Sequence, residues 1–404
     1  QYNSSLDVLH GDPIKLIPKY LQENSFDKLV FNRDYDSYSL NRDRLVCEVL
    51  KEKSISFESF KDSVIFENNE VLKYDNTPYH VYTAYKNKWL ECFFANNSVI
   101  DLCDSQYENL EKRQTCSISI QEWMKKLGFN SITNELIGGE KAGLLLLEKF
   151  KTKIDGYKKN RDFVAIDGTS NLSVYLRFGS ISIRDCVRAS LNFKSEGAKT
   201  WLQELIWRDF YSMILSSYPH TEHKSFKPDY DKIKWVDNDT LFLAWTSGKT
   251  GFPIIDASIR CLNETGRLHN RLRMINASFF CKTLRLHWKK GERYFAEKLF
   301  DYDKASNIGG WQWGASTGCD AAPYFRIFNP WLQSKKFDED ASFMKKWLPE
   351  LRDIPSKYFH DPVLLKQILV SNFGITHNKY MNPIVDYKKE RALALEMYKK
   401  GLAC

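Results

Sequence analysis

The sequence NIGGWQWGASTGCDAAPYFRIFNP occupies residues 307–330, and neither helical nor strand periodicity explains its residues. Outward from it, residues 140–404 show helical periodicity and no convincing strand. Residues 1–100 instead alternate short β-branched runs with amphipathic stretches. The sequence therefore predicts an α/β layer followed by an all-helical part.

Three segments support the prediction of an α/β layer. KLVFN at 28–32 and DSVIF at 62–66 are short apolar runs that predict buried strands, and RDRLVCEVLKEK at 42–53 has the spacing of a helix. Residues 101–139 mix polar side chains without a clear period, which indicates a connecting segment with one helix around SIQEWMKKLG, 119–128.

Composition excludes several classes of protein. The 404 residues are 43% hydrophobic and 27% charged, and no run approaches the roughly 18 apolar residues that span a bilayer, so a soluble globular protein without a membrane segment is expected. The nine cysteines fall singly and far apart, which argues against a disulfide scaffold or a metal site and favours the cytoplasm. The chain begins at Gln1 without a signal-peptide pattern, so we expect a processed protein or a fragment.

Charge is distributed unevenly along the chain. Residues 1–150 carry a net charge of −5, whereas residues 151–404 hold 41 Lys and Arg against 28 Asp and Glu, a net charge of +13. Nine of the eleven tryptophans also fall between Trp201 and Trp347. Basic and aromatic residues together suit binding to phosphates and stacking on bases. Tryptophans in a helical core with solvated lysines explain the same composition, so both interpretations stay open here.

The segment WLQELIWRDFYSMIL, 201–215, predicts a helix with two distinct faces. One face is apolar, and the other carries Glu204, Trp207, Arg208 and Tyr211 at positions i, i+3, i+4 and i+7. A carboxylate, an indole, a guanidinium and a phenol on one face suit a binding site. An internal ion pair between Glu204 and Arg208 is the alternative.

The segment RLHNRLRMINASFF, 267–280, repeats this arrangement with Arg267, Asn270, Arg271 and Met274 on one face. An amide donates and accepts hydrogen bonds, and a thioether packs softly against a planar group. A basic helix lying on phosphates is the alternative interpretation. Arg273 points elsewhere and needs an anion, for which Asp301 and Asp303 are both candidates.

Hydroxyl groups gather just ahead of the apolar run in GTSNLSVYL, 168–176. Thr169, Ser170 and Ser173 could form a phosphate-binding nest with free backbone N–H groups, and simple capping of a helix explains the same residues.

The stretch at 307–330 resembles the signature of the photolyase/cryptochrome flavoprotein family. TSNLSVYLRFGSISIRD (169–185), WLQELIWRDFY (201–211), GKTGFPIIDASIR (248–260), LHNRLRM (268–274) and DYDKASN (301–307) are similar to other blocks of this family, in the family's order. The resemblance implies α/β plus all-α architecture, with an incomplete Rossmann-like antenna domain over 1–100, a linker over 101–145 and a helical domain that binds FAD and DNA over 146–404.

The resemblance also assigns roles to individual residues. The expected FAD-binding residues are Tyr157, Thr169, Ser170, Asn171, Leu172, Ser173, Arg273, Asp301, Asp303 and Asn307, with Arg273 paired to Asp301 and Asn307 facing flavin N5. The expected catalytic residues around the lesion are Glu204, Trp207, Asn270, Met274 and Trp313. The expected DNA contacts are Arg161, Glu204, Trp207, Asn270, Arg271 and Gln333. Electrons are expected to reach the flavin through Trp235, Trp288 and Trp311.

Details within these blocks favour one branch of the family. Relatives that act on (6-4) photoproducts have histidines where this chain has Asn270 and Met274, and plant cryptochromes have aspartate in place of Asn307. Both features resemble class I enzymes that act on cyclobutane pyrimidine dimers. Arg267 stands where relatives often have tryptophan, which affects the rim of the pocket. The family's opening WFR-like motif is missing, so a folate or deazaflavin antenna is an open expectation.

The resemblance implies light-driven DNA repair, in which photoexcited reduced FAD donates an electron to a flipped-out pyrimidine dimer. Two alternatives remain. A cryptochrome-like photoreceptor would bind the same flavin without repair and usually has a long C-terminal tail, whereas this chain ends in a helical segment soon after WLPELRD, 347–353. A passive single-strand-binding module would be colourless. The expected partner is UV-damaged DNA, and the expected protein is a cytoplasmic monomer without a metal.

Overall fold

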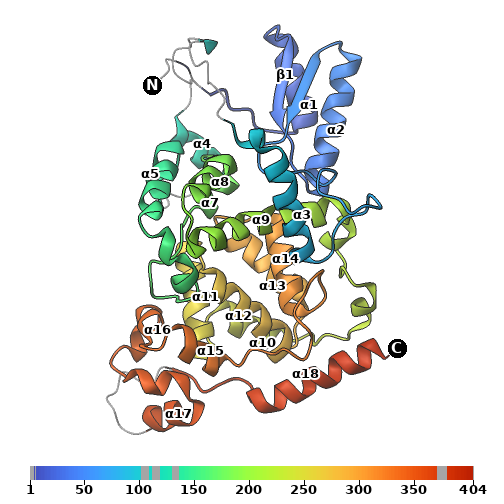
Figure 1. Cartoon of the computed structure of the whole chain (residues 1–404). Helices are drawn as coiled ribbons and strands as arrows, with labels where there is room; N and C mark the ends of the chain where they lie inside the picture. Colours follow the sequence, from blue (N-terminus) through green and yellow to red (C-terminus); the bar gives the residue numbers. More distant parts are fainter. Residues whose placement is uncertain are drawn as a thin grey trace.

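The computed structural model describes residue 4 and residues 6–101, 109–111, 119–129, 136–370 and 380–403. Its N-terminal part contains a pair of parallel strands, β1 (Lys28–Asn32) and β2 (Ser56–Phe60), in register from Lys28 opposite Ser56 to Asn32 opposite Phe60. Helices α1 (Pro13–Glu23) and α2 (Ser37–Glu52) pack against each other beside this pair (Figure 1). The strand predicted at 28–32 forms, but its predicted burial is wrong, because its residues alternate between exposed and half-buried. The predicted helix at 42–53 is the greater part of α2.

The prediction of a second strand at 62–66 is wrong, because the strand that pairs with β1 is β2. Val64, Ile65 and Phe66 are apolar for another reason: they are buried. The backbone N–H groups of Ile65 and Phe66 donate to the carboxylate of Asp209 instead of a neighbouring strand. A short apolar run alone does not distinguish a strand from an irregular buried segment.

Helices build the rest of the described chain, as the sequence predicts. They are α3 (Tyr82–Ala95), α4 (Ile120–Lys126), α5 (Glu140–Lys151), α6 (Tyr157–Asn160), α7 (Ser173–Arg177), α8 (Ile183–Leu191), α9 (Glu196–Ser217), α10 (Asp239–Thr246), α11 (Pro253–Thr265), α12 (Asn270–Ser278), α13 (Trp288–Lys298), α14 (Lys304–Ala315), α15 (Pro330–Phe337), α16 (Ser342–Trp347), α17 (Pro362–Val370) and α18 (Tyr387–Leu402). A π-helical turn, Phe279–Thr283, continues α12. The predicted helix near 119–128 is α4, which begins with a capping box between Ser119 and Glu122.

The long helix α9 lies at the centre of the helical part and organises its packing (Figure 1). Helices α3, α6, α8 and α14 all contact it. One hydrophobic core joins α9 to residues as early as Ile65 and Trp89, and a second core surrounds α11, α12 and α14. The domain boundaries at 100 and 145 stay predictions, and most of the predicted linker lies outside the described residues.

Within the described residues, no helix combines the length and the apolar character needed to cross a membrane.

Candidate functional site

A cavity of about 380 Å³ lies among α9, α12, α13 and α14. Its wall combines apolar and aromatic side chains with a small set of polar groups, as expected for a ligand site. The lining residues are Arg161, Glu204, Trp207, Arg208, Tyr211, Asn270, Arg273, Met274, Ala277, Phe295, Leu299, Asp301, Asp303, Ser306, Asn307, Gly310, Trp311 and Trp313. We call this space the main cavity.

Helix α9 presents its polar stripe to the main cavity. Glu204, Trp207, Arg208 and Tyr211 all line the cavity, since residues three and four positions apart share a helix face. The opposite face, including the fully buried Phe210, packs into the hydrophobic core. The helical spacing in the sequence therefore places these four side chains correctly.

Helix α12 forms the facing wall through Asn270 and Met274. The amide nitrogen of Asn270 lies 4.0 Å from the Met274 sulfur. Arg271 turns away from the cavity: its guanidinium pairs with Asp162 at 2.8 Å and lies over the ring of Phe337. Arg267 is exposed and lies outside the set of lining residues.

Glu204 forms an ion pair with Arg161, and the alternative pair between Glu204 and Arg208 does not form. Arg161 also stacks over the ring of Tyr157, with 5.4 Å from its Cζ atom to the ring centroid. Arg208 instead donates to the backbone carbonyl oxygens of Ser63 and Leu176. A carboxylate of fixed orientation thus stands at the edge of the main cavity.

Arg273 pairs with Asp301, one of the two candidates that the sequence leaves open. Its Nη2 atom lies 2.7 and 3.0 Å from the two carboxylate oxygens. Burial alone would raise the pKa of Asp301, but the charge of Arg273 and hydrogen bonds from Arg273 and Ser173 outweigh burial and lower this pKa. Asp301 is therefore an ionised carboxylate in the wall of the main cavity at neutral pH.

Asn307 is held in one orientation by Glu292. The Asn307 amide nitrogen donates to the Glu292 backbone oxygen at 3.0 Å and to its carboxyl oxygen at 2.9 Å. These bonds leave the Asn307 carbonyl oxygen as the acceptor that can face the main cavity. Burial raises the pKa of Glu292 and outweighs the hydrogen bond from Asn307. Sequence reasoning missed Glu292, whose only signal is its position four residues after Trp288 on the same helix face.

Several predicted residues lie outside the set that lines the main cavity. The segment from Thr169 to Ser173 leads into α7, with Asn171 in the left-handed region at a φ of 56°. The capping alternative fails, since Leu172 occupies the N-cap position of α7 without a side-chain hydrogen bond. The other residues outside the set are Tyr157, Arg271, Gln333, Trp235 and Trp288.

The three predicted electron-transfer tryptophans run from the surface toward the main cavity. Trp235 is half-buried, Trp288 is buried and Trp311 lines the cavity. The ring of His287 lies 5.5 Å from that of Trp235 and 5.9 Å from that of Trp288. A Cβ atom at Gly291 would overlap the ring of Trp311, so glycine allows this close packing.

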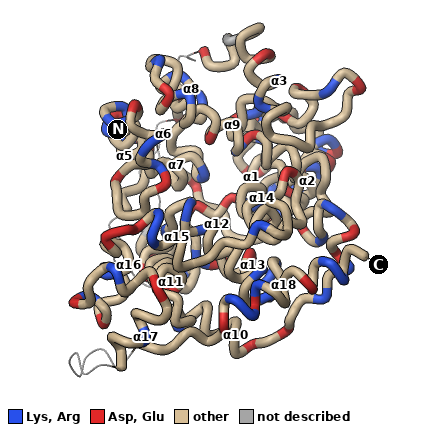
Figure 2. Tube along the Cα trace, turned by 60° about the horizontal axis from the view of Figure 1, so that its bottom comes forward, with Lys and Arg blue, Asp and Glu red and all other residues tan. Residues whose placement is uncertain are grey.

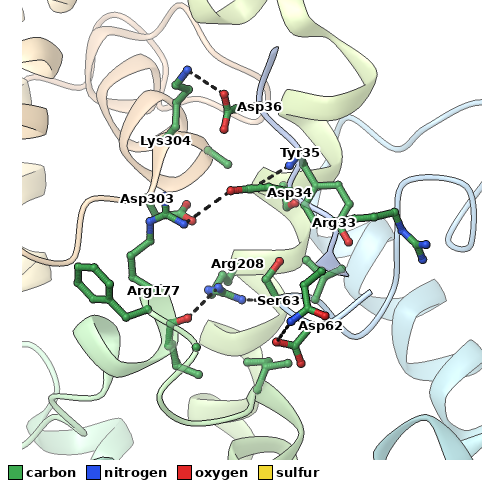
Figure 3. Close-up of a pocket in the computed structure, with 18 of the residues that line it drawn as sticks. Arg33, Asp34, Tyr35, Asp36, Asp62, Ser63, Arg177, Arg208, Asp303 and Lys304 are labelled. Carbon is green, nitrogen blue, oxygen red and sulfur yellow. Dashed lines mark hydrogen bonds and ion pairs between the residues drawn. The ribbon is translucent and has the colours of Figure 1, made fainter. Parts of the chain in front are cut away.

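A second cavity of about 250 Å³ lies between the N-terminal part and the helices (Figure 3). Residues 32–36 and 62–64 line one side, and residues 176–179 and 303–305 line the other. Lys304 bridges the two sides through an ion pair of 3.2 Å to Asp36, and it also pairs with Glu222 of the helical part at 3.2 Å. Asp303 lines both cavities, and its carboxylate caps α14 by accepting from the Ser306 N–H at 2.7 Å.

Comparisons with known protein families and with known proteins find photolyases over both parts of the chain. The family described as "FAD binding domain of DNA photolyase" matches residues 201–400, and the family described as "DNA photolyase" matches residues 1–101. A deoxyribodipyrimidine photo-lyase of Alkalihalophilus pseudofirmus is 39% identical over 98% of this chain and 83% of that protein. The deoxyribodipyrimidine photo-lyase of Escherichia coli is 38% identical over 95% of this chain and 81% of that protein.

Comparison with solved structures also finds photolyases. A bacterial class III photolyase from Agrobacterium tumefaciens superposes with a TM-score of 0.85 at 32% identity, over 98% of this chain and 83% of that one. An archaeal photolyase from Sulfolobus tokodaii, solved with two FAD molecules, gives a TM-score of 0.78 at 33% identity, over 98% and 83% of the two chains.

Proposed function

Because the chain belongs to the photolyase/cryptochrome family, we propose that it is a light-dependent DNA repair enzyme that splits cyclobutane pyrimidine dimers with FAD as its cofactor. The observation that carries this proposal is the main cavity, which Glu204, Trp207 and Asn270 line together with Asp303 and Asn307. One cavity thus offers polar and aromatic groups for a flipped-out lesion beside the groups expected for a flavin.

The chemistry of the residues present fits FAD. The hydroxyls of Thr169 and Ser170, with the backbone N–H groups of this segment, suit its phosphates, while the Ser173 hydroxyl donates to Asp301. The Arg273–Asp301 pair and Asp303 supply fixed charges at the cavity edge, and the Asn307 carbonyl oxygen can accept a hydrogen bond from an N–H of a reduced flavin. When bound, FAD would supply the light-driven electron for repair.

The lesion pocket follows from the two helix faces. Glu204 can accept hydrogen bonds from pyrimidine N–H groups, and Asn270 can both donate and accept. Trp207 and Trp313 would cover the apolar sides of two stacked pyrimidines, and Met274 would pack beside them. Since neither Asn270 nor Met274 can act as the proton donor that histidine provides for (6-4) photoproducts, we propose cyclobutane dimers as the substrate. Membership of class I stays a prediction.

The DNA would approach over the basic helices near the cavity. Figure 2 shows Lys and Arg on α12 and α15, which lie together where Arg271 packs over Phe337. Arg161, Arg271 and Gln333 would contact the backbone of the DNA. The net charge of +13 on residues 151–404 supports this proposal, because counterion release from phosphates favours binding to a basic surface.

Three further proposals complete this assignment. Trp235, Trp288 and Trp311 would carry electrons from the surface to an oxidised flavin.

A folate or deazaflavin antenna would lie near the second cavity, where the exposed Phe178 offers a flat apolar surface. The protein would act as a monomer in the cytoplasm, which size-exclusion chromatography and fractionation of cells would test.

The flavin assignment is tested by the absorption spectrum of the purified protein. We expect flavin bands in the wild-type protein and loss of flavin during purification of Asp303→Ala. Asp303→Asn is the matched control, because an amide oxygen can still accept from Ser306 and cap α14. Colourless protein that FAD does not reconstitute would rule out both the repair enzyme and a cryptochrome-like photoreceptor. A flavoprotein that repairs no dimer would favour the photoreceptor.

A further inference from the structure

Tyr82 stacks against Trp207, although the two residues come from different helices. Their ring centroids lie 3.6 Å apart and their planes differ by 8°. The Tyr82 hydroxyl donates to the backbone oxygen of Gln203 at 2.6 Å, one turn before Trp207 on α9. Tyr82 is 7% exposed, whereas Trp207 is half-buried and lines the main cavity.

We infer that Tyr82 is a positioning residue for recognition of the lesion: it fixes the orientation of the Trp207 indole and covers one of its faces. Only the other face is then available to the stacked pyrimidines of a dimer. This inference deepens the proposed function and rests on it, because it takes Trp207 as a wall of the lesion pocket.

The contacts of Trp207 explain why Tyr82 has this role. Its other aromatic contacts, a T-shaped one with Phe210 and a tilted one with Tyr211, come from its own helix α9. Neighbours on the same helix move together with the indole, so they do not fix it against the rest of the protein. The stack with Tyr82 does fix it, because Tyr82 belongs to α3 and its backbone N–H is bonded to Asp320, outside α9.

The backbone anchor connects Tyr82 to the segment that follows α14. The Tyr82 N–H donates to the Asp320 carboxylate at 3.0 Å. Asp320 lies seven residues after Trp313, in the segment that follows α14, and has a φ of 44° in the left-handed region. Helix α3, helix α9 and the segment after α14 therefore meet at Tyr82. A pre-oriented indole loses less conformational entropy on binding, which strengthens binding of the lesion selectively.

The test compares Tyr82→Leu with Tyr82→Phe. Loss of an aromatic stack corresponds to about a three- to tenfold change in affinity. For Tyr82→Leu we expect the Kd for dimer-containing DNA to rise by about that factor, with the Kd for undamaged DNA and the repair rate at saturating DNA unchanged. Tyr82→Phe keeps the ring, so we expect it to retain the discrimination of the wild-type protein.

Flavin content and the salt dependence of binding to undamaged DNA serve as folding controls. If Tyr82→Leu loses flavin, Tyr82→Met, whose unbranched and flexible side chain adapts better to the space of the ring, replaces it. Equal loss of affinity for damaged and undamaged DNA, or the same loss in Tyr82→Phe as in Tyr82→Leu, would overturn the inference.

A double-mutant cycle with Trp207→Ala separates this inference from the proposed function. If Tyr82 acts through Trp207, Tyr82→Leu should add no further loss of discrimination in the Trp207→Ala background. If the preference for damaged over undamaged DNA falls with Trp207→Ala but not with Tyr82→Leu, the role of Tyr82 is overturned and the lesion pocket is not. Discrimination that Trp207→Ala leaves unchanged would contradict the lesion pocket itself.

Discussion

Asp209 lies on the side of α9 that faces away from the main cavity, and we expect its charge to limit the stability of this helix. The residue is 1% exposed. One carboxylate oxygen accepts from the backbone N–H groups of Ile65 and Phe66 at 3.1 and 3.2 Å and from the Trp89 indole at 3.0 Å. Burial raises the pKa of Asp209 to about 6, against these hydrogen bonds and the charge of Arg208.

The raised pKa of Asp209 determines the sign and the size of the change in the free energy of unfolding with pH. The ordinary pKa is 3.8, so between about pH 4 and pH 6 the folded protein holds a proton that the unfolded chain has released. Folding therefore takes up a proton in this range, and the contribution of Asp209 to the free energy of unfolding falls as the pH rises. A shift of about two units corresponds to ~3 kcal/mol, present as a penalty above pH 6 and absent below pH 4.

The perturbation is Asp209→Asn, which keeps an oxygen acceptor for the three donors and removes the charge. We expect the variant to gain up to ~3 kcal/mol in stability over the wild-type protein between pH 4 and pH 7. Urea denaturation of both proteins across this range measures the change. Other titrating groups cancel in the difference between the two proteins. A difference in stability that stays constant with pH would show that Asp209 does not have a raised pKa in the folded protein.

Two further predictions concern the flavin and the DNA. Trp311→Phe should block photoreduction of oxidised flavin, followed by its absorbance, and leave dimer repair intact once the flavin is chemically reduced; equal loss of both would make Trp311 mainly structural. Arg161→Ala should weaken binding to damaged and undamaged DNA alike and reduce the slope of log K against log salt by about one, as titrations at several salt concentrations would show. A loss confined to damaged DNA would instead assign Arg161 to holding Glu204.

Local patterns in the sequence predicted the parts of the structure that depend on near neighbours. The spacing of Glu204, Trp207, Arg208 and Tyr211 places all four on the cavity wall, because a regular helix fixes their directions. The short apolar run at 28–32 likewise predicts the strand β1. The run at 62–66 was misread, because its apolar residues are buried by α9 and not by a sheet.

Contacts between distant segments could not be read from the sequence. The partner of Glu204 is Arg161, 43 residues earlier, and not Arg208 on the same helix face. Tyr82 reaches Trp207 from another helix, and Glu292 fixes Asn307 across two helices. Each pairing depends on how the helices pack, and helical periodicity determines which side of a helix is buried but not what lies against it.

The lesion that the protein repairs tests most directly whether Glu204 and Asn270 read a cyclobutane dimer. A dimer group left without its partner should lose about 1–3 kcal/mol of binding or transition-state stabilisation. Repair of oligonucleotides containing either a cyclobutane dimer or a (6-4) photoproduct is measured under blue light after flavin reduction, for the wild-type protein and Glu204→Ala. We expect repair of the cyclobutane dimer alone, reduced in Glu204→Ala while the flavin stays bound. Repair of the (6-4) photoproduct, or dimer repair that does not depend on Glu204, would contradict this expectation.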